Sequence, residues 1–188
     1  FLRNMLKENI KSIDVTDEEK NNLVAMLSGK GINITLDELS VIVNNAYDNT
    51  RNETLQAMEG LVHNLNTMHS RGGNQVVFSS INYGTDFSPE GRMVMRELLN
   101  TTSKGLGSGE VPVFPIQIFK VKEGISYNPE DPNYDLFQLA CKVSAKRLFP
   151  NFSFLDAPFN KQYYIEGRPE TECAYMGCRT RVIGNTYD

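Results

Sequence analysis

The chain has 188 residues, of which 40% are apolar and 22% are charged, and its formal net charge is −4. This composition is ordinary for a globular protein with a core. It excludes a strongly basic surface, which argues against direct nucleic-acid binding. The sequence contains no run of about eighteen apolar residues, so no transmembrane helix is predicted. No signal peptide is recognisable. We therefore expect a cytoplasmic protein with no membrane partner.

Two capping boxes mark the starts of helices in the first third of the chain. Thr16–Glu19 predicts a helix that ends near Ser28, and Thr35–Glu38 predicts a second one. The apolar stripe of the second helix is interrupted by the polar run Asp48–Glu53. We expect either two helices here or one long helix with a break near Asn49.

A turn and a strand follow this helical stretch. Arg71–Gln75 contains two adjacent glycines and predicts a turn; such glycines can also approach a phosphate or a base. Residues 76–83 predict a strand whose face changes from apolar at Phe78 to polar at Ser80 and Asn82. That change is typical of a barrel interior that reaches an active site, and the alternative is an edge strand with its polar groups in water.

The next elements alternate between helix and strand. Helices are predicted over residues 88–104, from a serine cap followed by proline, and over Asp131–Arg147. Strands are predicted over residues 114–121 and 151–156. Cys141 lies inside the second of these helices and is expected in the core. The alternation predicts an α/β fold with largely parallel strands.

The three cysteines, Cys141, Cys173 and Cys178, are too few for a disulfide framework, which favours a reducing compartment. Cys173 and Cys178 are five residues apart, a spacing that zinc knuckles do not use. His63 and His69 are expected on the second long helix as surface or packed residues, not as ligands. We therefore expect no metal site in this segment.

The segment Ala174–Val182 carries a cysteine between a glycine and an arginine. Glycine lets the backbone turn sharply, so the thiol of Cys178 would project from a tight loop. The guanidinium groups of Arg179 and Arg181 would lie nearby, a setting that suits a reactive sulfur. On these nine residues alone, a buried structural cysteine is the more frequent outcome.

Several segments together resemble one family, the anaerobic (class III) ribonucleoside-triphosphate reductases. The segments are His63–Arg71, Phe78–Gly84, Pro115–Lys120, Arg147–Phe152 and Tyr175–Arg181. The resemblance is nearly continuous from about Leu55 to the end of the chain and weak before it. It implies a mainly helical lead-in over residues 1–54 and part of a catalytic domain over residues 55–188.

The resemblance implies a ten-stranded α/β barrel of the glycyl-radical enzyme type, with a finger loop that carries the cysteine into the barrel. Cys178 matches the residue that becomes a thiyl radical and takes a hydrogen atom from C3′ of the ribose. The implied activity is the formate-dependent, anaerobic reduction of ribonucleoside triphosphates to deoxyribonucleoside triphosphates. Candidates for substrate binding are Ser79, Ser80, Asn82 and Arg179. Arg179 and Arg181 would either contact phosphate or brace the loop.

A second group of residues resembles the region near the dimer interface where a deoxynucleotide effector sets the choice of substrate. Its members are His63, Arg71, Gly72, Gly73, Asn74 and Gln75. Coupling between effector and substrate needs a loop with more than one arrangement, which adjacent glycines allow.

The family resemblance also implies partners and cofactors for the intact enzyme. It would form a homodimer, carry a C-terminal glycyl radical and a structural zinc ion, respond to dNTP and ATP effectors, and be activated by a radical-SAM iron–sulfur enzyme. The corresponding motifs are not found in this sequence, and Cys141 and Cys173 do not match the family's second active-site cysteine. We expect an internal fragment of a longer protein that binds none of these cofactors and is inactive alone.

Two other functions fit parts of the sequence. One is a nucleotide-binding regulatory or interaction module without catalysis, and the cysteine loop is what distinguishes it from the reductase. The other is a glycyl-radical lyase that acts on a carbon substrate. The long reductase-like segments before the cysteine argue against the lyase.

Overall fold

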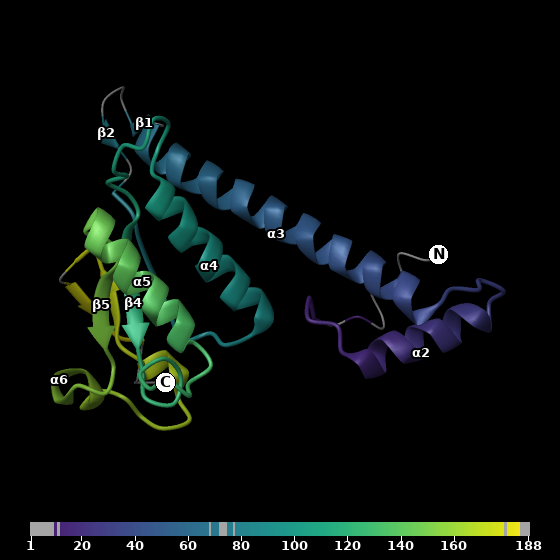
Figure 1. Ribbon diagram of the computed structural model, residues 1–188. Helices are drawn as coiled ribbons and strands as arrows, with labels where there is room; N and C mark the ends of the chain where they lie inside the picture. The colour runs from purple at the N-terminus through teal and green to yellow at the C-terminus, as the bar shows by residue number, and fades with distance from the viewer. Residues whose placement is uncertain are drawn as a thin grey trace. The chain divides into compact units, whose positions relative to one another are not determined.

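The computed structural model describes residue 10 and residues 12–67, 69–71, 75–76, 78–178 and 180–184. The chain divides into two compact units, Phe1–Thr54 and Leu55–Asp188. In chain order the elements are α2 (Asp17–Ser28), α3 (Leu36–Thr67), β1 (His69–Arg71), β2 (Gln75–Val76), β3 (Ser80–Tyr83), α4 (Pro89–Lys104), β4 (Ile116–Val121), α5 (Tyr134–Arg147), β5 (Asn151–Phe154), α6 (Pro158–Lys161), the 3-10 helix η1 (Pro169–Thr171), β6 (Ala174–Met176) and β7 (Thr180–Val182) (Figure 1).

Both predicted capping boxes are confirmed. The Thr16 N–H donates to Glu19 Oε2 at 2.8 Å, and the Glu19 N–H donates back to Thr16 Oγ1 at 3.3 Å. Thr35 and Glu38 repeat the exchange at 2.9 and 3.2 Å. Each box satisfies backbone N–H groups that the first turn of a helix leaves without partners, which is why the two helices begin at these residues.

The expected break near Asn49 is wrong, because α3 is one continuous helix of 32 residues. The polar run that suggested a break contains neither glycine nor proline, the residues that usually interrupt a helix. Its threonines bond within the helix: Thr50 Oγ1 donates to the Ala46 carbonyl, and Thr54 Oγ1 donates to the Thr50 carbonyl, each at 2.8 Å. A polar stretch on an exposed helix face therefore produced the gap in the apolar stripe.

The strand expected over residues 76–83 is divided in the structure. β2 pairs antiparallel with β1, so the chain reverses between Arg71 and Gln75 as predicted, while β3 belongs to a different sheet. His69 lies in β1, and its expected place on the long helix is wrong because that helix ends at Thr67.

The main sheet has three strands in the order β3-β4-β5, and both pairings are parallel. The predicted α/β class with parallel strands is therefore confirmed. Figure 1 shows α4 and α5 side by side on one face of this sheet. Asn133, which is completely buried just before α5, donates to the carbonyls of Gly84 and Asp86 at 3.0 and 2.8 Å and so ties the start of α5 to the end of β3.

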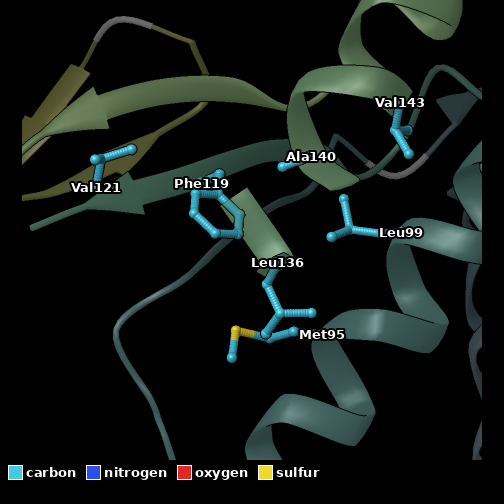
Figure 2. Packing of buried hydrophobic residues seen from close by; sticks show 7 residues of the cluster. All are labelled: Met95, Leu99, Phe119, Val121, Leu136, Ala140 and Val143. Carbon is cyan, nitrogen blue, oxygen red and sulfur yellow. The ribbon is translucent and has the colours of Figure 1, made fainter. Parts of the chain in front are cut away.

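The core lies between this face of the sheet and the two helices. Figure 2 shows side chains from three elements pointing toward one another; they are Met95 and Leu99 of α4, Phe119 and Val121 of β4, and Leu136, Ala140 and Val143 of α5. The α5 residues recur at helical spacing and form one buried stripe. Cys141 is exposed, so its expected place in the core is wrong: it follows Ala140 by one residue, a rotation of about 100° around the helix.

None of the helices in the described part of the chain combines the length and the apolar composition needed to cross a membrane.

Candidate active site on the cysteine hairpin

Cys178 lies at the tip of a short β-hairpin, which we call the cysteine hairpin (Ala174–Val182). Its strands β6 and β7 are antiparallel, and Met176 opposite Thr180 closes the ladder before the turn. Gly177 begins the turn with φ of +64°, a conformation that L side chains rarely adopt. A Cβ atom there would lie 3.3 Å from Phe78 Cζ. The turn therefore favours glycine before the cysteine, and a larger residue there would also press against the Phe78 ring.

The hairpin lies on the face of the sheet opposite the helices. Side chains alternate between the two faces of a strand, so Phe119 and Val121 of β4 point to the helical core and Lys120 points to the other face. The pairing registers place four further polar side chains on Lys120's face; they are Ser80, Asn82, Asn151 and Ser153. One face of the sheet thus packs against the helices, and the other, which we call the polar face, carries most of the polar side chains of the sheet and the cysteine hairpin.

Two side chains of β3 hold the hairpin by its backbone. Asn82 Nδ2 donates to the Tyr175 carbonyl at 2.7 Å, and the Tyr175 N–H donates to Asn82 Oδ1 at 2.9 Å. The Gly177 N–H donates to Ser80 Oγ at 3.1 Å. The structure therefore brings two of the predicted substrate-binding residues, Ser80 and Asn82, next to Cys178. Ser79 lies just before β3, where its carbonyl accepts from the Ile116 N–H at 2.9 Å.

The other side of the hairpin contacts α6 and the turn after it. The Tyr175 hydroxyl donates to Oδ1 of Asn160, a residue only 2% exposed, at 3.1 Å. The Arg181 guanidinium lies over the rings of Phe159 and Tyr163, at 5.5 and 5.3 Å from their centroids. Of the two roles considered for this arginine, bracing the loop is the one that these contacts support. Sequence reasoning missed Asn160 and the two rings, since it predicted no helix after the strand at residues 151–156.

The two cysteines of this region have different surroundings. Cys178 is exposed, whereas Cys173 is 2% exposed. Burial raises the pKa of the Cys173 thiol, and the positive charges of Arg181 and Lys120 oppose that rise. A thiol that is buried and rarely ionised is a structural residue, so Cys173 fills the base of the hairpin while Cys178 is available for chemistry.

A half-buried ion-pair cluster lies beside Cys173. Glu172 accepts from Lys120 Nζ at 2.8 Å and from Lys122 Nζ at 3.2 Å, and Lys122 Nζ also lies 4.6 Å from the centre of the Tyr164 ring. Sequence reasoning missed this cluster as well. The available signal was Lys120 inside a mostly apolar strand, because a lysine at such a position needs an acidic partner. The cluster connects β4 to the segment that leads into the hairpin.

A cavity of about 530 Å³ opens beside this cluster, and Lys122, Asn160 and Cys173 are among its lining residues. Cys178 does not line it. The cavity is therefore a feature of the hairpin's base and does not serve the exposed thiol at the tip.

The predicted effector residues lie in a separate part of the structure. His63 is on α3, where Thr67 Oγ1 lies 3.3 Å from its Nδ1 atom. Arg71 and Gln75 are partners in the β1–β2 register and flank the turn. Gly72, Gly73 and Asn74, like the substrate-binding candidate Arg179, lie outside the described residues. The β1–β2 register thus fixes the base of the predicted loop, while its effector contacts stay a prediction.

Within the described ranges, no three His, Cys, Asp or Glu side chains come together as a possible metal site. The side chains that contact the cysteine hairpin are neutral hydrogen-bonding groups and aromatic rings.

The model of one protein family, described as anaerobic ribonucleoside-triphosphate reductase, matches residues 14–187. The chain belongs to this family. Its expected resemblance is thereby confirmed, and the match covers the cysteine hairpin, the polar face of the sheet and α3.

Curated relatives support the same assignment. The chain is 32% identical to the anaerobic ribonucleoside-triphosphate reductase of Enterobacteria phage T4 over 144 residues, which is 76% of this chain and 23% of that protein. It is 35% identical to the reductase of Haemophilus influenzae over 129 residues, or 68% of this chain and 17% of that protein. The Escherichia coli reductase is 30% identical over 149 residues, or 78% of this chain and 20% of that protein. The chain therefore spans about a fifth of the length of these relatives.

Proposed function

We propose that this chain forms part of the catalytic barrel of an anaerobic ribonucleoside-triphosphate reductase and that Cys178 is its radical-carrying residue. The observation that supports this proposal is the position of Cys178, at the tip of a hairpin bonded to the polar face of a parallel α/β sheet. Membership of the reductase family supports a role for that thiol in nucleotide reduction. Additional strands would continue the three-stranded sheet into the ten-stranded barrel and enclose the thiol, which is exposed in this segment.

In the proposed reaction the Cys178 thiyl radical takes the hydrogen atom from C3′ of the ribose and becomes a thiol. The radical at C3′ labilises the 2′-hydroxyl, which leaves as water after protonation. Replacing that hydroxyl by hydrogen is a two-electron reduction, which formate supplies as it is oxidised to carbon dioxide. The hydrogen atom is then returned to C3′, which regenerates the thiyl radical. A thiol suits both transfers because its S–H bond is close in strength to the activated C–H bond.

The residues of this chain would contribute geometry rather than acid–base chemistry. Atom transfer requires the sulfur to be held close to C3′ and away from water. Ser79 and Arg179 are proposed to contact the nucleotide, whereas the polar atoms of Ser80 and Asn82 are already bonded to the hairpin backbone. The β1–β2 turn and His63 are proposed to respond to a deoxynucleotide effector at the interface of a homodimer.

The remaining parts of the reaction belong to the intact enzyme. We propose that a glycyl radical outside this segment, installed by a radical-SAM iron–sulfur activating enzyme, oxidises Cys178. The structural zinc ion of the family would likewise be held outside this segment. We also propose that the enzyme acts in the cytoplasm.

The test is Cys178→Ser in the intact, activated enzyme, with Cys141→Ser as the matched control because Cys141 is also exposed but lies on α5. Cys178→Ser should abolish nucleotide reduction, since a serine O–H bond is too strong to supply the hydrogen atom, while substrate binding persists. Cys141→Ser should leave both unchanged. Reduction that survives Cys178→Ser would contradict the assignment, and nucleotide binding by a wild-type enzyme without any reduction would support the regulatory module instead.

A further inference from the structure

Asn82 makes a pair of hydrogen bonds that a side chain rarely makes to a strand. Its carboxamide both donates to and accepts from the backbone of one residue, Tyr175, at 2.7 and 2.9 Å. An amide is the side-chain group that carries a donor and an acceptor in the arrangement of a peptide. Asn82 therefore pairs with β6 as a neighbouring strand would.

Ser80 adds a second attachment in the same register. It accepts from Gly177, so a step of two residues along β3 matches a step of two residues along β6. Because alternate residues share a face of a strand, both side chains reach the hairpin from the same face of β3. The order of the contacts, Asn82 with Tyr175 and Ser80 with Gly177, makes β6 run antiparallel to β3 across that face. Cys178 follows Gly177 directly, and its place above the sheet is set by this register.

We propose that Asn82, assisted by Ser80, is the positioning residue that fixes Cys178 for hydrogen-atom transfer. This inference rests on the proposed function for its catalytic consequence. It gives both residues a role besides the predicted substrate binding, because each already bonds to the hairpin backbone. A radical transfer needs the sulfur within roughly 3–3.5 Å of the ribose carbon, so the attachment of the hairpin sets how often the thiol is in place.

Asn151 offers a matched control. Asn82, Ile118 and Asn151 occupy one row across the sheet, so the two asparagines point to the same face from opposite strands. Within the described residues, the hydrogen bonds from the sheet to β6 come from Asn82 and Ser80 and not from Asn151. Asn82→Asp and Asn151→Asp therefore make the same chemical change at equivalent places, and only the first puts a second acceptor against the Tyr175 carbonyl.

The experiment compares these two variants in the intact enzyme. For Asn82→Asp we expect kcat to fall by about tenfold or more with an unchanged substrate Kd, since the reaction requires correctly placed reacting groups and fewer molecules would hold the thiol in place. Loss of the attachment should also accelerate hydrogen exchange at the hairpin amides by up to about tenfold. Asn151→Asp should leave kcat, the substrate Kd and hydrogen exchange at the hairpin amides unchanged. A raised substrate Kd with unchanged hairpin exchange would make Asn82 a substrate ligand and overturn the proposal.

A second variant and the exchange measurement keep the test decisive. If Asn82→Asp does not fold, Ser80→Ala, which loses only the Gly177 contact, is judged by the same three readouts. If the wild-type enzyme reduces no nucleotide, the proposed function fails, and hairpin exchange still decides whether Asn82 holds the cysteine segment. Hairpin exchange that is as slow in Asn82→Asp and in Ser80→Ala as in the wild type would overturn the positioning role whatever the activity.

Discussion

Gly177 and Cys173 lie on either side of β6, and their surroundings differ from those of the exposed Cys178. The backbone of Gly177 is in the left-handed region, with the Phe78 ring against its missing side chain. Cys173 is buried beside Glu172, Lys120 and Arg181, and its thiol is shielded from solvent. Cys178 follows the constrained glycine directly and is exposed.

Gly177→Ala should loosen the cysteine hairpin. The left-handed conformation costs an alanine roughly 1–2 kcal/mol, and the contact with Phe78 adds to that cost. Gly124→Ala is the matched control, since Gly124 has φ of +77° with nothing within 4 Å of an added Cβ. Hydrogen exchange measures the free energy of local opening, which Gly177→Ala should lower more than Gly124→Ala does. Adding Phe78→Ala to Gly177→Ala should recover part of the difference. Equal losses would show that Phe78 does not crowd this position.

Cysteine labelling under native conditions should follow exposure. Cys178 and Cys141 should react first with iodoacetamide, and Cys173 last, because Cys173 is both buried and raised in pKa. A raised pKa means that less of the thiol is ionised at any given pH. The labelling rate of Cys173 should therefore rise at a higher pH than that of a thiol with an ordinary pKa. Peptide mass spectrometry on a time course measures the order. Labelling of Cys173 as fast as of Cys178 would contradict the buried site.

Helices α4 and α5 pack against each other and are joined at one end by charges. Asp135 accepts from Arg92 Nη2 at 3.0 Å and from Arg96 Nη2 at 2.5 Å. Partial burial raises the pKa of the Asp135 carboxyl, but hydrogen bonds from Arg96 and Arg92 outweigh it and hold the pKa below its usual value. The pair of helices is thus stabilised by a core along its length and by an ion-pair cluster at the start of α5.

Asp135→Asn should weaken the packing of α4 on α5 modestly, by about 0.2–1 kcal/mol, because the carboxyl is 47% exposed and water screens the pair. Its lowered pKa means that the contribution is present above the unfolded-state pKa and is lost as pH falls through the folded-state pKa. Denaturant unfolding of wild type and variant should therefore differ at neutral pH and converge in acid. A difference that persists in acid would point to a cause other than the charge.

Leu136→Ala should be far more damaging, with a cost of about 2–5 kcal/mol. Leu136 is completely buried against Met95 and Leu99 (Figure 2), and its removal leaves a cavity at the centre of the core. Leu148→Ala is the control, since Leu148 is 82% exposed and should change the free energy of unfolding by about 0.5 kcal/mol or less. Similar costs for the two leucines would contradict the assigned core.

Structural features that a few adjacent residues determine could be predicted from the sequence. Features that depend on contacts between residues far apart in the sequence could not. The capping boxes at Thr16 and Thr35 fix helix starts locally, and the order of strands and helices gave the parallel sheet. The division of the strand near Ser80 depends on β1 and β4 as pairing partners, which no local pattern reveals. In the site, Cys178 and its glycine were visible, whereas the contacts of Asn160 and Glu172 require the folded chain. The family resemblance supplied the chemistry.

At the scale of the whole molecule, the matched part of this chain covers about a fifth of the length of its relatives. Among the described strands, β4 has a neighbour on each side, whereas β3 and β5 each pair on one side only. In a closed barrel both outer strands would have second partners, and strands with unpaired edges are prone to association.

The amides of β3 and β5 should therefore exchange faster in the isolated 188-residue segment than in the intact enzyme. The central strand β4 is the internal control, because its partners are present in both forms. Hydrogen exchange measured by mass spectrometry on the two proteins gives the comparison. Equal protection of the outer strands in both would indicate that this sheet does not continue into a barrel.

Because the cysteine hairpin bonds to alternate residues of β3, its register on the sheet can change only in steps of two residues. If the hairpin moved by one residue along β3, it would face β3 residues whose side chains point to the opposite face of the sheet. The next register with side chains on the correct face is therefore two residues, or about 6.6 Å, away. That distance is well beyond the reach of an atom transfer. A weakened attachment should therefore lower the fraction of enzyme molecules that can react, while each molecule that remains in register reacts at the full rate.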